Sequence, residues 1–214
     1  MRPAPPTSPA TPRRALIFHG YGATPADHWF GRLAEQLGAC GISTEIPALP
    51  DPGDPHPGRW EDAVRAALGT PDEQTIVIAH SLGCLSVLRV LRSLPDPWGL
   101  GMLILVSGFT EPLPALPELD RFIAGGCDAT RLPGRIDRLL VVRSDDDPIV
   151  PPPHTDRVAE QLGVTARVVP GAGHFLAADG VTELPLVRDA IVAPPRHRCA
   201  GADRPIEQIS DGSA

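Results

Sequence analysis

Short apolar runs alternate along the chain with stretches in which apolar residues recur at helical spacing. The runs predict six strands, at 15–18, 42–46, 75–79, 102–106, 138–142 and 166–169. Helical spacing predicts five helices, at 28–39, 59–68, 82–94, 155–162 and 184–192. This alternation indicates an α/β fold with a parallel sheet, because parallel strands need a crossover that a helix usually provides. Several runs are apolar throughout, as expected for strands that helices cover on both faces.

Two terminal segments differ from the rest of the chain. Residues 1–13 contain five prolines and almost nothing to bury, and residues 194–214 are similarly polar, so we expect both to be disordered. The intervening residues 14–193 suffice for one domain. Within them, 110–135 is the only stretch that could serve as a lid, so any cap over the sheet is expected to be minimal or absent.

Polar residues follow the predicted strands at the points where the strands end. HGYG follows the first strand, HSLG the third and SGF the fourth, while RSDDDPIVP and PGAGHF follow the last two. In an open parallel sheet, ligands bind at the carboxyl ends of the strands, near the point at which strand order reverses. These segments therefore predict where a functional site lies.

Ser81 stands between a predicted strand and a predicted helix, in the segment TIVIAHSLGC. This is the setting of the G-x-S-x-G nucleophile elbow, in which a tight turn exposes a serine hydroxyl above the sheet. Ala79 replaces the first glycine of the motif. It adds one methyl group at a position that needs no positive φ, and Gly83 is kept, so the elbow is expected to form. The ordinary alternative is a serine that only caps a helix.

Asp147 and His174 supply the other two groups that a serine nucleophile needs. An imidazole must take the hydroxyl proton, and a carboxylate must orient the imidazole and stabilise its cation. The order Ser81, Asp147, His174 along the chain is that of α/β-hydrolases. Of three consecutive aspartates, we choose Asp147 because Pro148 restrains its backbone, and we expect the other two to face solvent or cap the loop.

Two backbone amides are candidates for an oxyanion hole. One belongs to Leu82, the residue after the serine, and the other to Tyr21 in the HGYG loop. Gly20 and Gly22 let the backbone of this loop approach a ligand closely. The loop could instead hold a dinucleotide phosphate, but it lacks the G-x-G-x-x-G spacing, and no acidic residue ends the second strand.

Aromatic residues near strand ends are candidates for lining a substrate pocket, namely Trp29, Phe109 and Phe175, although such residues are more often core. His19 is expected to structure the oxyanion loop, and His80 to pack or to form a local hydrogen bond. The remaining histidines outside the proposed triad are expected at the surface: His28, His56, His154 and His197.

Composition excludes several function classes. The net charge of −7, with acids and bases interspersed, gives no sign of a nucleic-acid partner, and no apolar run approaches the length of a membrane span. All 19 basic residues are arginine, which excludes Schiff-base catalysis and a Walker lysine. The four cysteines form no C-x-x-C pair, and the apolar run after Arg14 is too short for an export signal. We therefore expect a cytoplasmic protein with free thiols and no metal or cofactor.

Six segments occur in a characteristic order: IFHGYGATPADHWF, LPDP, IVIAHSLGC, LILVSGF, RSDDDPIVP and GAGHFLAADGVTELPLV. Together they resemble the small serine hydrolases grouped with retinoblastoma-binding protein 9 and bacterial YdeN-type proteins. The resemblance implies a compact α/β-hydrolase with little or no cap and a triad of Ser81, Asp147 and His174. Alanine two residues before the serine is also what YdeN-type relatives look like. The retinoblastoma-binding partner does not carry over, because no L-x-C-x-E stretch is present, and the aminopeptidase-like activity of that member is only suggestive.

The sequence thus predicts a serine hydrolase that cleaves a small-molecule ester or amide through an acyl-enzyme on Ser81. Two alternatives stay open, namely a hydrolase-fold binding protein without turnover and a cofactor-free hydrolase-fold enzyme of another chemistry. A complete set of three groups argues against the binding protein, which has no need of them.

Overall fold

The computed structural model describes residues 13–193, so His197, the predicted tail and all of the predicted leader except Arg13 lie outside the described residues. Six strands form one sheet in the order β2-β1-β3-β4-β5-β6, and every pairing is parallel. Their bounds are β1 (Arg14–Phe18), β2 (Ser43–Glu45), β3 (Thr75–His80), β4 (Leu100–Val106), β5 (Ile136–Ser144) and β6 (Arg167–Val169). The predicted six-stranded parallel sheet is confirmed.

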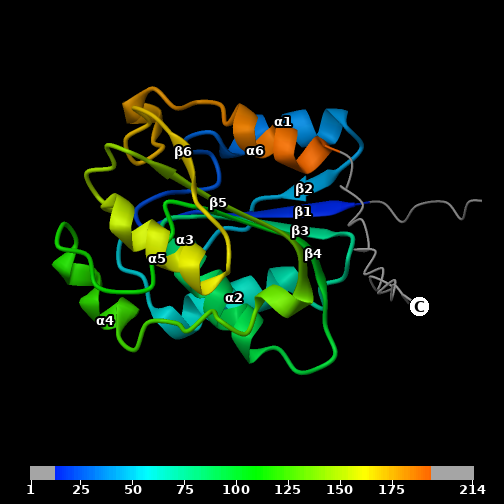
Figure 1. Ribbon diagram of the computed structural model, residues 1–214, viewed down its shortest axis with the longest axis horizontal. Helices are drawn as coiled ribbons and strands as arrows, with labels where there is room; N and C mark the ends of the chain where they lie inside the picture. The colour runs from blue at the N-terminus through cyan, green and yellow to red at the C-terminus, as the bar shows by residue number, and fades with distance from the viewer. Residues whose placement is uncertain (1–12, 194–214) are drawn as a thin grey trace, which may run out of the picture.

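Helices cover both faces of the sheet (Figure 1). One face carries α1 (Phe30–Ala39) and α6 (Pro185–Val192), and the other carries α2 (Pro57–Leu68), α3 (Leu82–Ser93) and α5 (Pro152–Gln161). All five predicted helices are present. Two of them, α2 and α5, begin earlier than predicted because each starts at a proline, which suits a first turn whose N–H groups lack helical partners. No helix within residues 13–193 is long and apolar enough to cross a membrane.

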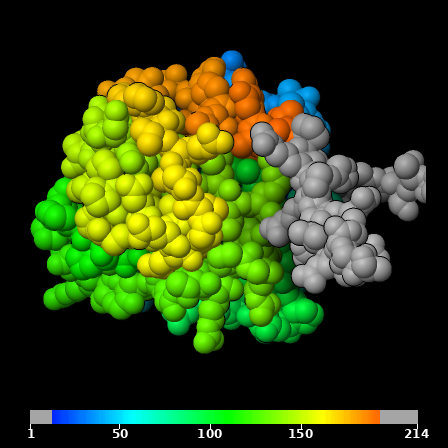
Figure 2. Space-filling view, in the orientation of Figure 1, coloured from blue at the N-terminus to red at the C-terminus, as the bar shows by residue number. Residues whose placement is uncertain are grey.

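Side chains along the central strands alternate between two cores. Leu16 and Phe18 of β1 pack on the side of α2, α3 and α5, whereas Ala15 and Ile17 pack on the side of α1 and α6. Every residue of β3 is buried. Burial on both faces explains why these strands read as continuous apolar runs instead of alternating ones. In the space-filling view, the yellow to orange segments around α5, β6 and α6 form much of the upper half of the visible surface (Figure 2).

The strand order reverses between β1 and β3. From β1 the chain adds β2 on one side, and from β3 it adds the remaining strands on the other. Phe18 at the end of β1 is in register with Ala79 of β3, so the residues that follow these two strands emerge side by side. Ligand sites of open parallel sheets lie at such a point.

The 110–135 segment carries three short helical turns and is held on α3. These turns are η1 (Pro117–Leu119), α4 (Asp120–Ile123) and η2 (Pro133–Arg135). The guanidinium of Arg89 on α3 donates hydrogen bonds of 3.0–3.1 Å to the carbonyl oxygens of Phe122, Ile123, Ala124 and Gly126. Carbonyls at the end of a helix have no partner within it, and Arg89 provides one. The 110–135 segment is therefore a small cap that Arg89 holds in place against α3.

Replacing Arg89 with leucine should remove all four of these hydrogen bonds. Because the Arg89 side chain is only 15% exposed, the carbonyls would lose a charged donor without full access to water. We expect the free energy of unfolding to fall by about 2–4 kcal/mol, measured by urea denaturation, with faster amide exchange at 122–126. Arg131→Leu, at an exposed position of the same segment, is the control and should leave both quantities near the parent values.

Candidate active site

Ser81 lies in a sharp turn between β3 and α3. Its backbone has φ 52° and ψ −124°, a combination that a residue with a side chain adopts at a cost of about 1–3 kcal/mol. The Ser81 N–H donates to the carbonyl of Val106 at 2.9 Å, which ties the turn to the end of β4. The Ser81 hydroxyl forms no hydrogen bond to the backbone of α3, so it is not the helix cap that the alternative reading required.

Glycines at two positions let the turn pack against β1. A Cβ atom at Gly83 would overlap the carbonyl oxygen of His19, and one at Gly20 would lie 2.8 Å from the Cβ of Ser81. Ala79, by contrast, is a buried residue of β3 without a positive φ. The elbow therefore needs its second glycine for close approach, and it accommodates alanine in place of the first.

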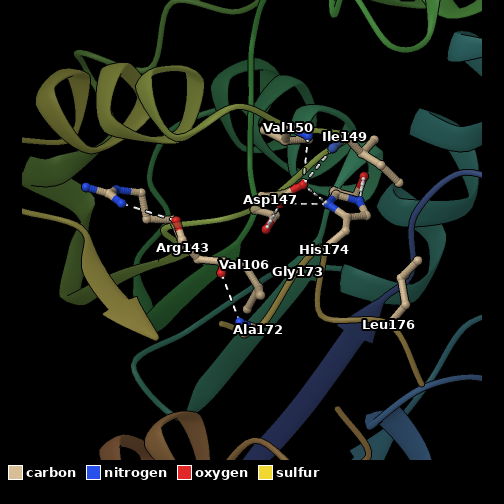
Figure 3. Close-up of polar contacts among 12 residues, drawn as sticks. Val106, Arg143, Asp147, Ile149, Val150, Ala172, Gly173, His174 and Leu176 are labelled. Carbon is tan, nitrogen blue, oxygen red and sulfur yellow. Dashed lines mark hydrogen bonds and ion pairs between the residues drawn. The ribbon is translucent and has the colours of Figure 1, made fainter. Parts of the chain in front are cut away.

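The three residues chosen from the sequence form one row of hydrogen bonds. His174 Nε2 lies 2.9 Å from Ser81 Oγ, and His174 Nδ1 lies 2.8 Å from Asp147 Oδ2 and 3.1 Å from Asp147 Oδ1. Asp147 follows β5 and His174 follows β6, and Figure 3 shows the carboxylate facing the imidazole ring. The three residues are only 4–6% exposed. With Nδ1–H donating to the carboxylate, Nε2 is free to accept the serine proton.

Backbone and side-chain donors surround the Asp147 carboxylate. Oδ1 accepts from the amides of Ile149 and Val150, each at 2.9 Å (Figure 3), and Oδ2 accepts from the hydroxyl of Ser107 at 2.8 Å. Burial alone would raise the pKa of Asp147. The hydrogen bonds from His174, Val150 and Ser107 outweigh burial, so the pKa lies below its ordinary value and the group is a carboxylate at neutral pH.

The other two aspartates of the triplet hold the loop that carries His174. Asp145 accepts from the amide of Gly171 at 2.8 Å, and Asp146 accepts from the amide of Gly173 at 2.9 Å. Both residues are exposed, as expected. Asp146 also accepts from the hydroxyl of Ser144 in its own segment. Both aspartates bind the loop after β6 as well, which lies beside theirs because β5 and β6 are paired.

Asp179 fixes the backbone of His174, a role that sequence reasoning missed. Its Oδ2 accepts from the amides of His174 at 2.9 Å and Leu176 at 3.0 Å. Gly173 has φ 52°, and a Cβ there would lie 2.6 Å from the Asp179 carboxylate carbon. The only available signal was an acidic residue five positions after the histidine, which predicts nothing without the fold of the loop.

His80, at the end of β3, contacts both the backbone and the ring of His174. It is wholly buried, its Nε2–H donates to the carbonyl of His174 at 2.9 Å, and the two rings lie 4.9 Å apart between centroids. Burial, and then the nearby His174, hold the pKa of His80 well below its usual range, so it stays neutral. The expectation that His80 packs is confirmed, but its hydrogen bond is not local, because the acceptor lies on the loop after β6.

His19 links the loop after β1 to the proline-rich connection at 49–58. Its Nε2 accepts from the amide of Leu49 at 3.0 Å, which leaves the proton on Nδ1 to donate to Gly20 O at 3.0 Å. Burial lowers the pKa of His19, and the neutral form is the one that these two partners require. His19 thus structures the loop in which Tyr21 lies.

The expected surface positions of the other histidines are only partly correct. His56 is exposed. His28 is half-buried, and its Nδ1 accepts from the amide of Ala177 at 3.2 Å. His154 is also partly buried, with its Nδ1 3.0 Å from a carboxylate oxygen of Glu111. The expectation failed for these two because loops distant in sequence fold over them.

The amides of Tyr21 and Leu82 are the two candidates for an oxyanion hole. Within residues 13–193, neither amide donates a hydrogen bond to a backbone carbonyl, whereas the amide of Gly22 donates to Pro52 O at 2.8 Å. Leu82 is the first residue of α3, so its N–H lies at the positive end of the helix dipole. Both amides are thus available to a ligand.

Comparison with known proteins places this geometry in a family. The family model described as serine hydrolase matches residues 15–193. YdeN of Bacillus subtilis (strain 168) is 37% identical over 181 residues, which cover 85% of this chain and 95% of YdeN. The chain belongs to the serine hydrolase family. Its activity is therefore hydrolytic, and the fold prediction of an α/β-hydrolase is confirmed.

Further comparisons concern the fold and one more distant relative. The crystal structure of the ydeN gene product from B. subtilis superposes with a TM-score of 0.80 at 37% identity, covering 84% of this chain and 96% of that chain. Serine hydrolase RBBP9 of Rattus norvegicus is 26% identical over 170 residues, covering 78% of this chain and 89% of RBBP9. Est1E from Butyrivibrio proteoclasticus shares the fold, with a TM-score of 0.60 at 17% identity over 85% of this chain and 90% of that chain.

The aromatic residues expected to line the pocket of this serine hydrolase lie in its core instead. Trp29, Phe109 and Phe175 are each 0% exposed, so none contributes surface to an open pocket. Trp29 and Phe175 pack on the α1 and α6 side of the sheet, and Phe109 packs on the other side. The prediction that they line the pocket is wrong, because helices and loops cover the segments in which these residues lie.

A cavity of about 570 Å³ adjoins the loop after β1 that carries Tyr21. One wall is the connection from Gly53 to Pro57, and the other comes from Glu118, Leu119, Arg121 and Phe122. Tyr21 also lines the cavity, and its neighbour Gly20 packs against Ser81. The loop after β1 therefore contacts both the serine and the cavity. A second hollow, of about 500 Å³, lies at the opposite end of the sheet, where β4 and β5 begin.

Within the described residues, no group of three or more His, Cys, Asp or Glu side chains is placed to hold a metal ion.

Gly83→Ala should destabilise this serine hydrolase, because the new methyl group would meet the backbone carbonyls of Phe18 and His19. These carbonyls and Gly83 cannot separate unless β1 or α3 shifts. We therefore expect a loss of about 2–4 kcal/mol in the free energy of unfolding. Gly31→Ala is the matched control: Gly31 is helical, its Cβ would meet no atom within 4 Å, and alanine there should stabilise the fold by about 0.5–1 kcal/mol. Thermal and urea denaturation measure both. Equal effects of the two variants would contradict the packing argument.

Proposed function

We propose that Ser81, His174 and Asp147 form a catalytic triad that hydrolyses a small ester or amide through an acyl-enzyme on Ser81. The observation that supports this most strongly is the continuous row of hydrogen bonds from the carboxylate through both ring nitrogens to the serine hydroxyl. The strained backbone of Ser81 and the buried but not sealed position of all three groups support the same proposal.

In the first half of the reaction, Ser81 Oγ attacks the carbonyl carbon of the substrate while His174 Nε2 accepts the hydroxyl proton. Asp147 stabilises the imidazolium through its bond to Nδ1–H. The oxygen of the tetrahedral intermediate carries a negative charge, which the amides of Tyr21 and Leu82 and the N-terminal end of α3 would stabilise. Collapse breaks the bond to the alcohol or amine, which takes the proton from Nε2. Water then repeats the sequence and releases the acid.

The neutral state of His80 fits this mechanism. A second cation 4.9 Å from the His174 ring would oppose formation of the imidazolium. Because burial keeps His80 uncharged, it can hold the backbone of His174 by a hydrogen bond without adding charge to the site.

The cavity next to Tyr21 is the proposed place for the part of the substrate beyond the scissile bond. Its volume lies within the range of small-ligand sites, and the shared loop connects it to Ser81. Leu119 and Phe122 are apolar residues that line the cavity, while Arg121 and Glu118 at its rim are exposed. This combination suits a small ester or amide better than a large polymer.

A cytoplasmic location is also proposed. Of the four cysteines, the three within the described residues, Cys40, Cys84 and Cys127, are free thiols. Free thiols are usual for proteins of reducing compartments. Burial raises the pKa of Cys127 and, more strongly, that of Cys84, so neither is a competing nucleophile.

Ser81→Ala should abolish covalent labelling by a fluorophosphonate and lower kcat/KM for p-nitrophenyl acetate by roughly 10⁴-fold or more. Asp147→Asn should lower kcat to a similar extent while labelling becomes slow, because the imidazole loses its orienting carboxylate. Circular dichroism checks that both variants fold. Parent protein that is folded but neither labelled nor active would favour the binding-protein alternative, whereas labelling without hydrolysis of any ester or aminoacyl amide would favour another chemistry.

Arg121→Trp should narrow the proposed substrate cavity without disturbing the core, since Arg121 is exposed at its rim. We expect kcat/KM for bulky p-nitrophenyl esters to fall by roughly tenfold relative to p-nitrophenyl acetate. Arg131→Trp is the matched control, because Arg131 is an exposed arginine of the same segment that lines the hollow at the other end of the sheet. A second set of esters varies the size of the acyl group or of the alcohol group. The cavity proposal fails if kcat/KM depends on size in the same way in Arg121→Trp and in Arg131→Trp.

A further inference from the structure

The end of β4 connects the serine turn to the Asp147 carboxylate. The carbonyl of Val106, the last residue of β4, accepts from the amide of Ser81 at 2.9 Å. The next residue, Ser107, donates its N–H to Val142 O at 2.9 Å and its hydroxyl to Asp147 Oδ2 at 2.8 Å. The peptide unit between Val106 and Ser107 therefore binds the serine turn through its carbonyl and β5 through its N–H, and the Ser107 hydroxyl beside it binds the carboxylate.

Ser107 occupies a conformation that its side chain disfavours. Its φ is 47°, in the left-handed region where glycine is the usual residue, and its side chain is fully buried. The Ser107 hydroxyl makes a single side-chain hydrogen bond within the described residues, and the acceptor is Asp147. A buried hydroxyl on strained backbone, directed at a carboxylate, is a group with a specific task.

The hydroxyl shares its acceptor oxygen with the histidine. Asp147 Oδ1 is occupied by the amides of Ile149 and Val150, whereas Oδ2 accepts from Ser107 and, at 2.8 Å, from His174 Nδ1. An ionised carboxylate has about four acceptor positions, and these donors fill them. The carboxylate therefore cannot rotate without breaking at least one hydrogen bond, and Ser107 restrains the oxygen that faces the imidazole.

We infer that Ser107 is a positioning residue for the proposed hydrolysis, which it serves by fixing Asp147 Oδ2 in line with His174 Nδ1 and by drawing part of the carboxylate charge away from the imidazole. This inference rests on the proposed triad. Ser107 does not contact the substrate or the reacting atoms. It acts through Asp147, and its hydroxyl neither gives up nor accepts a proton during turnover.

The surroundings of His174 allow a clear expectation for pH dependence. The titratable groups near it are Asp147 after β5, His80 at the end of β3, His28 before α1, Asp146 on the neighbouring loop and Asp179 in η3 (Ala177–Asp179). Among these groups, Ser107 forms a hydrogen bond only with Asp147. Removal of its hydroxyl leaves more negative charge on Oδ2, so the imidazole should retain its proton to a higher pH.

Two variants separate the hydroxyl from the backbone strain. Ser107→Ala removes the hydroxyl and keeps the strain, whereas Ser107→Gly removes the hydroxyl and relieves the strain. We expect kcat for p-nitrophenyl acetate to fall roughly tenfold in both variants with KM unchanged. The acid-side midpoint of the kcat/KM profile should move upward by roughly half a pH unit in both. The glycine variant should be at least as stable to heat as the alanine variant.

Three results would overturn the inference: parent-like kcat and acid midpoint in both variants, full recovery of activity in Ser107→Gly alone, or a downward shift of the midpoint. The second of these would assign the effect to strain. NMR titration of the His174 imidazole in parent and variants gives a reading that does not need turnover. If the parent neither labels nor hydrolyses esters, the proposed function fails, and this titration still decides whether Ser107 acts on His174 through Asp147.

Discussion

The hydrogen bond between His174 Nδ1 and Asp147 Oδ2 is the contact on which the rest of the site depends, because it decides which ring nitrogen faces Ser81. It joins two loops that follow β5 and β6, and its length of 2.8 Å holds only while those strands keep their register. Asp145 and Asp146 on the first loop bind amides of the second, so the same loops that carry the pair also hold each other. The site is therefore built from contacts between neighbouring strand ends.

Backbone strain gathers around this contact. Of the five non-glycine residues with positive φ within residues 13–193, Ser81 and Ser107 belong to the network itself and Phe175 directly follows His174. Each such residue costs about 1–3 kcal/mol, which the surrounding structure must offset. The offset comes from the strands beneath, since β3 is buried at every residue and β4 at all but one. Strands that are packed on both faces can hold strained turns at their carboxyl ends without rearranging.

The parts of this structure that were predictable from sequence are those that local pattern controls. Continuous apolar runs identified the strands, and the polar segments after the runs, with the chain order serine, aspartate, histidine, identified Ser81, Asp147 and His174. Asp179 and the loop-binding role of Asp146 were not predictable, because they depend on how loops from separate strands meet. The pocket prediction failed for a related reason. An aromatic residue near a strand end gives no information about whether later segments will cover it, and they cover all three.

The cavity proposed for substrate lies between the two segments with the least regular pattern, 49–58 and 110–135. They face each other across the cavity, and both are anchored: Trp60 Nε1–H donates to Pro50 O at 2.7 Å, and Arg89 binds the carbonyls that follow Phe122. The rings of Trp60 and Phe122 also meet edge to face, with 5.4 Å between their centroids. Because each wall is held by hydrogen bonds, and Trp60, which anchors one wall, also contacts Phe122 of the other, the cavity has a defined shape. Under that proposal, a cavity of fixed shape would select substrates by size, whereas selection by closure of a lid would require the Arg89 contacts to break.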